Sequence, residues 1–295
     1  MDGLRDELKR VMEQRGLSQR AVSKMLGISS STLSQWISDK YPGDAAQVDA
    51  AVESFLQLHK QRSKAPRRPI VFVETSAAAK GLEVCELCHQ DQEIGVLFGE
   101  AGYGKTVLIK EYCKRYPDVI LIEADLGFCA RMLFLELAKK LGLDGAGVIH
   151  NIFDDCVGKL RNSGRLLIID EAELLPYRAL ELLRRLHDKA GIGILLVGMP
   201  RLISNLRGRQ GEYAQLYSRV GIAAKLEMLS ESDTKKLVDA VLPQADGLYR
   251  TFHEESKANA RTLQKLLNRS VRVAAINGID VNHDVIRAAA ETLII

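Results

Sequence analysis

Apolar residues recur at helical spacing from the start of the chain to a glycine break that precedes Ser18. Beyond this break, Ser18 can cap a second helix that ends at Gly27, and Ser29 or Ser30 can cap a third. A further helical pattern follows after a second break. The pattern predicts a small helical bundle over residues 1–60, with two short helices joined by a tight turn.

From residue 61 to residue 70 the chain is basic, contains two prolines and lacks apolar periodicity, which predicts a linker. Apolar runs then alternate with helical patterns, which is typical of a parallel sheet with helices on both faces. The runs cover residues 94–98, 119–122, 166–169, 194–197 and 222–226. We therefore predict an α/β fold in four parts: the helical bundle (1–60), the linker (61–70), a core with a five-stranded parallel sheet (71–229) and a helical lid (230–295).

Composition restricts the class of protein. Hydrophobic residues make up 46% of the chain and charged residues 27%, which is typical of a folded globular protein and excludes a mainly disordered one. The absence of a long apolar run or an apolar signal segment leads us to expect a cytoplasmic protein. The five cysteines are an odd number, so we expect free thiols.

A glycine-rich segment directly follows the first predicted strand and opens a helix. Residues 99–106, Gly-Glu-Ala-Gly-Tyr-Gly-Lys-Thr, match the phosphate-binding pattern G-x-x-x-x-G-K-[ST] of the P-loop. Glycines allow backbone N–H groups to turn toward phosphate oxygens, Lys105 reaches the β- and γ-phosphates, and Thr106 offers its hydroxyl to Mg²⁺. The predicted nucleotide-binding residues are Gly99, Glu100, Ala101, Gly102, Tyr103, Gly104, Lys105, Thr106 and Val107.

A second motif supplies acidic groups. The apolar run of residues 166–169 ends in Asp170 and Glu171. Asp170 can hold Mg²⁺ together with Thr106, while Glu171 can polarise the water that attacks the nucleotide. The alternative is a buried strand followed by an acid at a helix start, but this would leave the P-loop unexplained. We expect ATP and Mg²⁺ as ligands, with Lys105 and Glu171 in the hydrolytic reaction.

These two motifs resemble those of the AAA+ family. The resemblance implies an arginine supplied to a neighbouring subunit's ATP and an arginine in the helical lid, and the matching positions are Arg219 and Arg261. For either arginine the alternative is a surface ion pair or a DNA contact. The family also carries a polar residue at the end of the fourth strand, where this chain has Met199, and this difference puts the hydrolysis rate in doubt.

Residues 19–37 resemble a helix-turn-helix of the phage-repressor type, although Ser23 stands where a small apolar residue is usual. The second helix would present its polar side chains to DNA: Ser29, Ser30, Ser31, Ser34 and Gln35. Because this helix lacks an arginine that could grip guanine with two hydrogen bonds, we expect weak sequence discrimination. The alternative is a small domain that docks to protein.

Positive charge is concentrated in two segments, although the net charge is only +3. One is the linker, and the other runs from residue 201 to residue 225. Basic clusters suit phosphate backbones, so we expect DNA contacts at Arg201, Arg207 and Arg209. The alternative is that these are solvated charges of loops.

The order of these parts resembles the AAA+ ATPases that select target DNA in phage-type transposition. The resemblance implies an ATPase, stimulated by DNA and by oligomerisation, that forms an ATP-dependent helical oligomer on duplex DNA with little sequence specificity. It further implies delivery of that DNA to a transposase, in a host cytoplasm if the protein is phage-encoded. Two alternatives remain open, a helicase-loader ATPase and a nucleotide-switched transcription regulator.

Overall fold

The computed structural model describes residues 2–64, 72–208, 214–243, 245 and 247–293. The chain divides into two compact units. One comprises Met1–Arg68 with Val271–Asp280, and the other comprises Pro69–Ser270 with Val281–Ile295. Across the described residues, no helix is both long and apolar enough to cross a membrane.

The first unit contains four helices of the N-terminal segment: α1 (Asp2–Arg15), α2 (Gln19–Leu26), α3 (Ser30–Ile37) and α4 (Ala45–Lys64). Local hydrogen bonds define the predicted turn. The hydroxyl of Ser18 accepts from the N–H of Ala21, and Gly27 ends α2 in the left-handed conformation at φ 70°. The hydroxyl of Ser29 caps α3 by accepting from the N–H of Thr32. The helix-turn-helix fold is therefore confirmed.

Ser23, the unusual polar residue of this fold, is buried and has partners. Its hydroxyl donates to the carbonyl of Arg20 and bonds the hydroxyl of Ser30 at 3.1 Å. A buried hydroxyl with partners avoids the cost of an unsatisfied polar group, which explains why the core tolerates it. At the other end of the bundle, α4 continues to Lys64, beyond the expected start of the linker, while residues 65–71 lie outside the described part.

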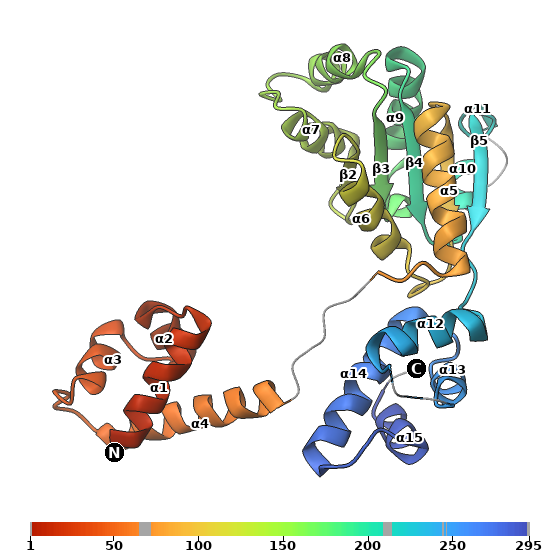
Figure 1. The fold of residues 1–295 in the computed structure, drawn as a ribbon. Coiled ribbons are helices and arrows are strands. Elements are labelled where there is room, and N and C mark those ends of the chain that lie inside the picture. The colour runs from red at the N-terminus through yellow and green to blue at the C-terminus, as the bar shows by residue number, and fades with distance from the viewer. Residues whose placement is uncertain (1, 65–71, 209–213, 244, 246, 294–295) are drawn as a thin grey trace. The chain divides into compact units, whose positions relative to one another are not determined.

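The second unit is built on a parallel sheet in the order β2-β3-β4-β1-β5 (Figure 1). The strands are β1 (Ile94–Phe98), β2 (Ile120–Glu123), β3 (Leu166–Asp170), β4 (Gly193–Gly198) and β5 (Val220–Lys225). All five strands were predicted, because each combines a short apolar run with flanking turn residues. In this order β1 lies between β4 and β5, so the segment that follows β1 lies beside the end of β4.

Helices cover both faces of this sheet. Helices α5 (Ser76–Gln90) and α6 (Lys105–Arg115) cover one face, and α7 (Ala130–Lys140), α8 (Ile149–Leu160) and α9 (Tyr177–Ala190) cover the other. Strand residues alternate between the two layers. In β1, for example, Val96 packs into one core and Leu97 into the other. Shorter elements link the strand ends: η1 (Ala172–Leu174), α10 (Arg201–Arg207) and α11 (Ala214–Tyr217).

A helical lid follows β5 and has its own apolar core around Phe252, Leu263 and Ile286. Its helices are α12 (Glu231–Val241), α13 (Tyr249–Glu255), α14 (Ala260–Asn277) and α15 (His283–Glu291). Asp233 joins this lid to the sheet domain, because its carboxylate accepts hydrogen bonds from the N–H and the hydroxyl of Ser76. Burial raises the pKa of this carboxyl, but the bonds from Ser76 and Ser230 outweigh it and hold the pKa below its usual value.

Candidate nucleotide-binding site

The glycine-rich loop joins β1 to α6 and requires backbone conformations that favour glycine. Gly102 and Gly104 have φ values of 85° and 92°. Gly99 is confined for a different reason, since a Cβ there would lie 2.8 Å from the carbonyl oxygen of Leu226. Gly104 directly precedes α6, so the loop ends at the amino terminus of a helix, where the helix dipole favours phosphate.

Lys105 begins α6 and its side chain folds back over the loop. Its ammonium donates to the carbonyl oxygens of Gly99 at 2.7 Å and Glu100 at 2.9 Å. Partial burial lowers the pKa of this ammonium, and the negative charge of Asp170 opposes that shift. The cation is thus held within the loop by groups that are weaker partners than a phosphate.

Thr106 connects the two predicted motifs. Its hydroxyl donates to Oδ2 of Asp170 at 2.7 Å, although the two residues lie 64 positions apart in the sequence. Asp170 ends β3 and is only 3% exposed. Burial raises the pKa of its carboxyl, whereas the hydrogen bonds from Thr106 and from the N–H of Glu171 lower it. The structure therefore brings the hydroxyl and the carboxylate together at the carboxyl edge of the sheet.

This oxygen pair fits a magnesium ion. Mg²⁺ prefers oxygen ligands and is usually held by one or two protein groups together with substrate phosphates. Thr106 and Asp170 supply a hydroxyl and a carboxylate oxygen within hydrogen-bonding distance of each other, beside a loop built for phosphate. These two residues are the ones that would hold the ion.

Glu171, the predicted base, follows Asp170 in the left-handed conformation at φ 54°. Such backbone is uncommon outside glycine and often occurs at functional positions. Its side chain is exposed, in contrast to the buried neighbours on either side. The backbone thus turns this carboxylate away from the core.

The lid contacts the glycine-rich loop through residues at the start of α14. The N–H of Arg261 donates to the carbonyl of Gly102 at 3.0 Å, and the guanidinium is close enough to lower the pKa of Lys105. Asn259, which the sequence analysis missed, donates to the carbonyl of Ala101 at 2.8 Å and accepts from the N–H of Thr262. The signal for Asn259 in the sequence is its place as a cap before a helical pattern.

The remaining predicted residues of the loop have simpler surroundings. Glu100, Ala101 and Val107 are exposed, and the N–H of Tyr103 donates to the carbonyl of Glu100 at 3.4 Å. A second residue missed by the sequence analysis is Glu173 in η1, whose buried carboxylate packs against Gly198 at the end of β4.

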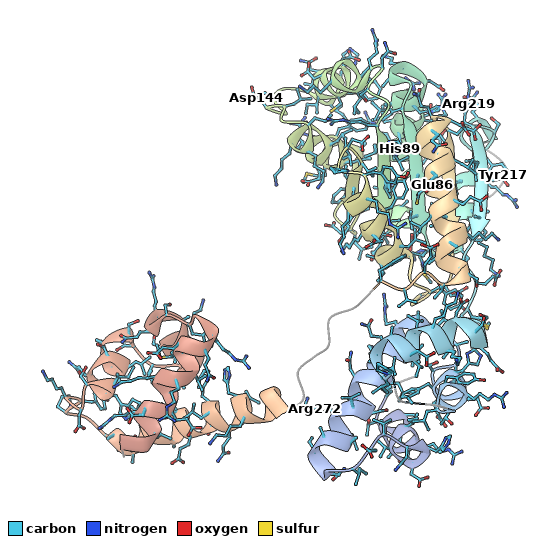
Figure 2. All side chains as sticks on the ribbon, viewed as in Figure 1. Glu86, His89, Asp144, Tyr217, Arg219 and Arg272 are labelled. Atoms are coloured by element: carbon cyan, nitrogen blue, oxygen red, sulfur yellow. The ribbon has the colours of Figure 1, made fainter. Side chains whose placement is uncertain are left out.

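Arg219 lies apart from the loop of its own chain. It directly precedes β5, whose first residue Val220 pairs with Ile94 at the amino end of β1, whereas the loop follows the carboxyl end. Five residues of β1 span about 16 Å at the usual rise per residue. Arg219, labelled in Figure 2, is exposed. Its side chain lies 3.9 Å from the carboxylate of Asp188.

The predicted DNA-binding arginines have different partners. Arg201 begins α10 and lies 3.8 Å from the carboxylate of Glu173, while the guanidinium of Arg207 donates to the hydroxyl of Tyr217 at 2.8 Å and stacks over its ring. Both arginines are exposed. Arg209 lies outside the described residues.

The predicted DNA-facing residues of α3 and its cap are all exposed, but several of their hydroxyls have local partners. The hydroxyl of Ser29 contacts those of Ser31 and Thr32, and Ser30 bonds Ser23. Ser34 and Gln35 are exposed on the same helix.

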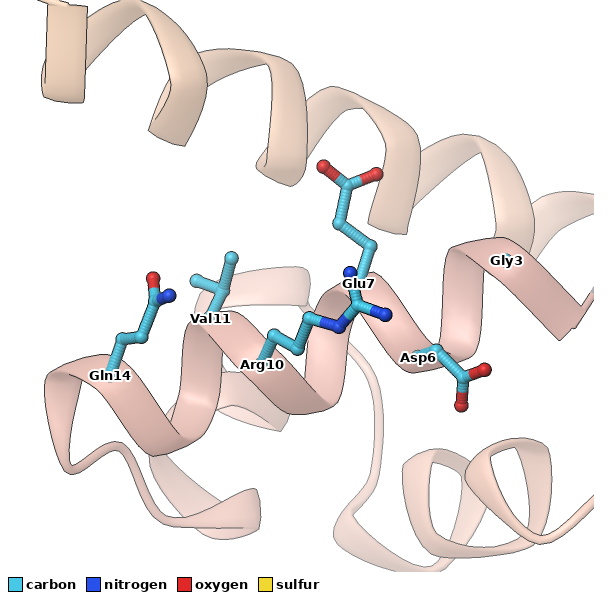
Figure 3. A pocket seen from close by; sticks show the side chains of 6 residues that line it. All are labelled: Gly3, Asp6, Glu7, Arg10, Val11 and Gln14. Atoms are coloured by element: carbon cyan, nitrogen blue, oxygen red, sulfur yellow. The ribbon is translucent and has the colours of Figure 1, made fainter.

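A shallow hollow lies elsewhere in the N-terminal unit, along α1. Figure 3 shows its lining residues, which are Gly3, Asp6, Glu7, Arg10, Val11 and Gln14. Glu7 in this hollow pairs with Lys60 at 2.7 Å. The hollow belongs to α1, apart in sequence from both α3 and the glycine-rich loop.

Two family models match segments of this chain. An AAA domain model matches residues 88–206, and a helix-turn-helix model matches residues 8–44. Among solved structures, the chain is similar to the ORC2 protein of Aeropyrum pernix, with a TM-score of 0.60 and 18% identity over 79% of this chain and 72% of that one. It is also similar to the RuvB Holliday junction branch migration motor of Thermotoga maritima, with a TM-score of 0.52 and 19% identity over 78% of this chain and 73% of that one. At these identities the likeness establishes the fold.

Curated relatives cover more of the chain. The ATP-dependent target DNA activator B of Escherichia phage Mu is 29% identical over 98% of this chain and 95% of the relative. The Mu-like prophage FluMu DNA transposition protein B of Haemophilus influenzae is 28% identical over 80% of this chain and 84% of the relative. The chain therefore combines a helix-turn-helix domain with an AAA+ module, and along nearly its whole length it resembles the target DNA activator B of phage Mu.

Proposed function

We propose that this chain is a DNA-dependent ATPase that assembles on target DNA in its ATP-bound state and delivers that DNA to a transposase. The hydrogen bond between Thr106 and Asp170 carries the proposal, because it joins the phosphate loop to the acidic strand end that Mg-ATP needs. The helix-turn-helix domain and the resemblance to an ATP-dependent target DNA activator support the role in transposition.

In the proposed reaction, Lys105 exchanges its two carbonyl partners for oxygens of the β- and γ-phosphates. Glu171 orients a water and takes its proton as the water oxygen bonds the γ-phosphorus. The bond between the β,γ-bridging oxygen and the γ-phosphorus breaks, which yields ADP and phosphate. Mg²⁺ held by Thr106 and Asp170 would neutralise charge on the phosphate oxygens.

The position of Arg219 supports the proposed assembly on DNA. Arg219 lies at the amino ends of the strands, and the phosphate loop lies at their carboxyl ends. The arginine can therefore serve an ATP held by another subunit but not its own. An arginine placed there would neutralise charge on the transferred phosphoryl group. ATP binding between neighbouring subunits would thus favour a helical oligomer on duplex DNA, and hydrolysis would release subunits.

Electron microscopy with random-sequence duplex and a slowly hydrolysed ATP analogue tests this proposal. We expect helical assemblies with the analogue and their loss with ADP. The Lys105→Ala variant should not assemble, whereas Lys114→Ala, which removes an exposed lysine of the same helix, should assemble normally. Absence of wild-type assembly would contradict the proposal. Binding restricted to a palindromic operator would favour a transcription regulator, and lack of DNA binding by the full chain would favour a helicase loader.

Mixing experiments test Arg219 separately. Arg219→Ala should lower turnover by about 10³-fold, while leaving nucleotide affinity nearly unchanged. Added Lys105→Ala subunits carry an intact Arg219 and should restore part of the turnover of the Arg219→Ala subunits. If Arg219 instead contacts a DNA phosphate, mixing will not restore turnover, and the dependence of log affinity on log salt will fall by about one unit.

A further inference from the structure

Asn259 directly precedes α14, where the lid contacts the phosphate loop. Its side-chain carbonyl oxygen, Oδ1, accepts from the N–H of Thr262 at 3.2 Å, which is the hydrogen bond of a helix N-cap. Its side-chain amide nitrogen, Nδ2, donates to the backbone carbonyl of Ala101 at 2.8 Å, 158 positions away in the sequence. The same side chain therefore bonds both the lid helix and the phosphate loop.

The choice of asparagine at this position has a chemical reason. Asparagine, aspartate and serine cap helices about equally well, so capping alone does not require asparagine. An ionised aspartate can only accept hydrogen bonds, whereas asparagine carries an acceptor and a donor on one planar group. Because Thr262 presents an N–H and Ala101 presents a carbonyl, both ends of the Asn259 amide have the partner they need.

A second bond between the lid and the loop lies beside the first. The backbone N–H of Arg261 donates to the carbonyl of Gly102 at 3.0 Å. The first N–H groups of a helix have no partner within the helix, so this donor is available to the loop. The lid approaches so closely that a Cβ at Gly102 would lie 2.3 Å from Oδ1 of Asn259. The lid thus bonds two consecutive carbonyls of the loop, and glycine at position 102 permits the approach.

These two bonds also orient N–H groups of the loop. A trans peptide is planar, and its C=O and N–H point in opposite directions. The bond to the carbonyl of Ala101 therefore also fixes the N–H of Gly102, and the bond to the carbonyl of Gly102 fixes the N–H of Tyr103. Backbone N–H groups are the part of a phosphate loop that binds phosphate oxygens. The lid thereby orders two peptide groups of the loop before a ligand binds.

We propose that Asn259 is a positioning residue that preorganises the phosphate loop, so that nucleotide affinity depends on the contact between lid and loop. The inference rests on the proposed function only in that this loop binds ATP. A loop that is already ordered loses less conformational entropy when nucleotide binds. Nucleotide must in turn stabilise the lid contact by the same factor by which the contact raises nucleotide affinity. The factor expected for one neutral hydrogen bond is about five.

Two substitutions in the lid separate this role from helix capping. Asn259→Ser keeps a cap acceptor for Thr262 but removes the amide that bonds Ala101. Asn282 offers the matched control, because it caps α15 by accepting from the N–H of Val285 at 3.0 Å. Among the described residues, no hydrogen bond joins Asn282 to the phosphate loop. Asn282→Ala therefore weakens a lid helix and leaves the contact with the loop in place.

Titration of the full chain with a fluorescent, slowly hydrolysed ATP analogue and Mg²⁺ measures nucleotide affinity. We expect Asn259→Ser to bind the analogue about fivefold more weakly, and Asn282→Ala to bind it as the wild type does. Thermal melts should show the opposite order, with the larger loss of stability in Asn282→Ala, because serine keeps a cap and alanine removes one. A residue that only supported the lid would lower affinity in proportion to the loss of stability.

Amide hydrogen exchange followed by NMR tests the reciprocal effect without any substitution, so it stands even if Asn259→Ser does not fold. In the wild type, saturating analogue should slow exchange of the Arg261 N–H, whose acceptor lies in the loop, by about fivefold. The N–H of Val285, whose acceptor is the cap of α15, should exchange at the same rate with and without analogue.

The outcomes separate this inference from the proposed function. If the wild type does not bind the analogue, both the proposed function and the inference fail. If it binds but Asn259→Ser keeps the wild-type affinity, or Asn282→Ala loses as much affinity as Asn259→Ser, the inference alone is overturned. Unchanged exchange of the Arg261 N–H in the saturated wild type also overturns it.

Discussion

The start of α3 and the start of α6 both carry hydroxyl side chains. The hydrogen bonds of these hydroxyls differ in how far apart the bonded residues lie in the sequence. At α3, Ser29 bonds Thr32 three residues away and Ser30 bonds Ser23 seven residues away. At α6, the hydroxyl of Thr106 bonds Asp170, which lies 64 residues away. The bonds at α3 shape a turn, whereas the bond at α6 joins this helix to the end of strand β3.

This difference separates polar groups that support the fold from those available for a ligand. The hydroxyls of Ser29 and Ser30 cap or join short helices, which leaves Ser34 and Gln35 better placed to contact a base. In the nucleotide site, the polar groups of Lys105 and Thr106 bond groups that a phosphate or a metal ion could replace. Substitutions at the start of α6 should therefore change nucleotide binding and hydrolysis. Substitutions of Ser29 or Ser30 should mainly lower the stability of the helix-turn-helix and should affect DNA recognition only as a consequence.

The largest expected effect is at Glu171. In Glu171→Gln, the water loses its general base while Asp170 and Thr106 keep their contact, so turnover should fall by about 10³-fold with nucleotide binding retained. Steady-state ATPase assays and nucleotide titration measure the two quantities. Glu136→Gln, at a half-buried ion pair of α7, is the control. Wild-type turnover in Glu171→Gln would remove this residue from the reaction.

Lys105→Ala should have the next largest effect. The substitution removes two charge-assisted hydrogen bonds to phosphate, worth about 3 kcal/mol together, so ATP affinity should fall by about 100-fold. Isothermal titration calorimetry with a slowly hydrolysed analogue measures this change. An affinity within threefold of the wild type would show that the ammonium does not reach the phosphates.

Asp233→Asn tests the long-range contact between Asp233 and Ser76, which supports the fold and has no proposed part in ligand binding. Its carboxylate bonds Ser76, which lies 157 residues away, and the loss of charge should lower the free energy of unfolding by about 2 kcal/mol at pH 7. Because the folded state holds the pKa of Asp233 below its usual value of about 3.9, this contribution is present above that pH. It is lost as pH falls through the folded pKa. Denaturant unfolding at pH 7 and near pH 3 should show the difference between the two chains shrinking in acid.

A smaller effect is expected for the cap of α3. Ser29→Ala removes the acceptor for the N–H of Thr32 and should lower the stability of the helix-turn-helix by about 1 kcal/mol. Ser34→Ala, an exposed change on the same helix, should leave stability unchanged. Hydrogen exchange of the amides of α3 measures both. Equal exchange in the two variants would contradict the capping role.

The smallest effect concerns DNA recognition by α3. Ser34→Ala and Gln35→Ala should each weaken DNA binding by about threefold, because each removes one neutral hydrogen bond. The salt dependence should stay unchanged, since neither residue neutralises a phosphate. Arg207→Ala should instead weaken binding and lower the salt dependence by about one unit. No change in either α3 variant would favour a protein-docking role for this domain.

Much of the fold could be predicted from the sequence because its signals are local. Ser18, Gly27 and Ser29 mark helix ends by their capping chemistry, and the structure places the ends of α2 and the start of α3 there. The linker boundary is less sharp. Helix α4 continues to Lys64, since the polar residues after position 60 form helix as readily as linker. The division into four domains and the roles of the individual site residues remain predictions.

The amino-acid sequence by itself determined the order of helices and strands, the glycine-rich loop and the acidic strand end, because periodicity, caps and motif spacing act over a few residues. Only the tertiary structure decided which distant groups meet. It placed Asn259 against Ala101 and buried Glu173 beside Arg201. It also placed Arg219 at the amino end of β5, whereas the phosphate loop follows the carboxyl end of the neighbouring strand β1. Such contacts depend on how whole strands and helices pack, and local sequence signals such as caps and periodicity do not specify that packing.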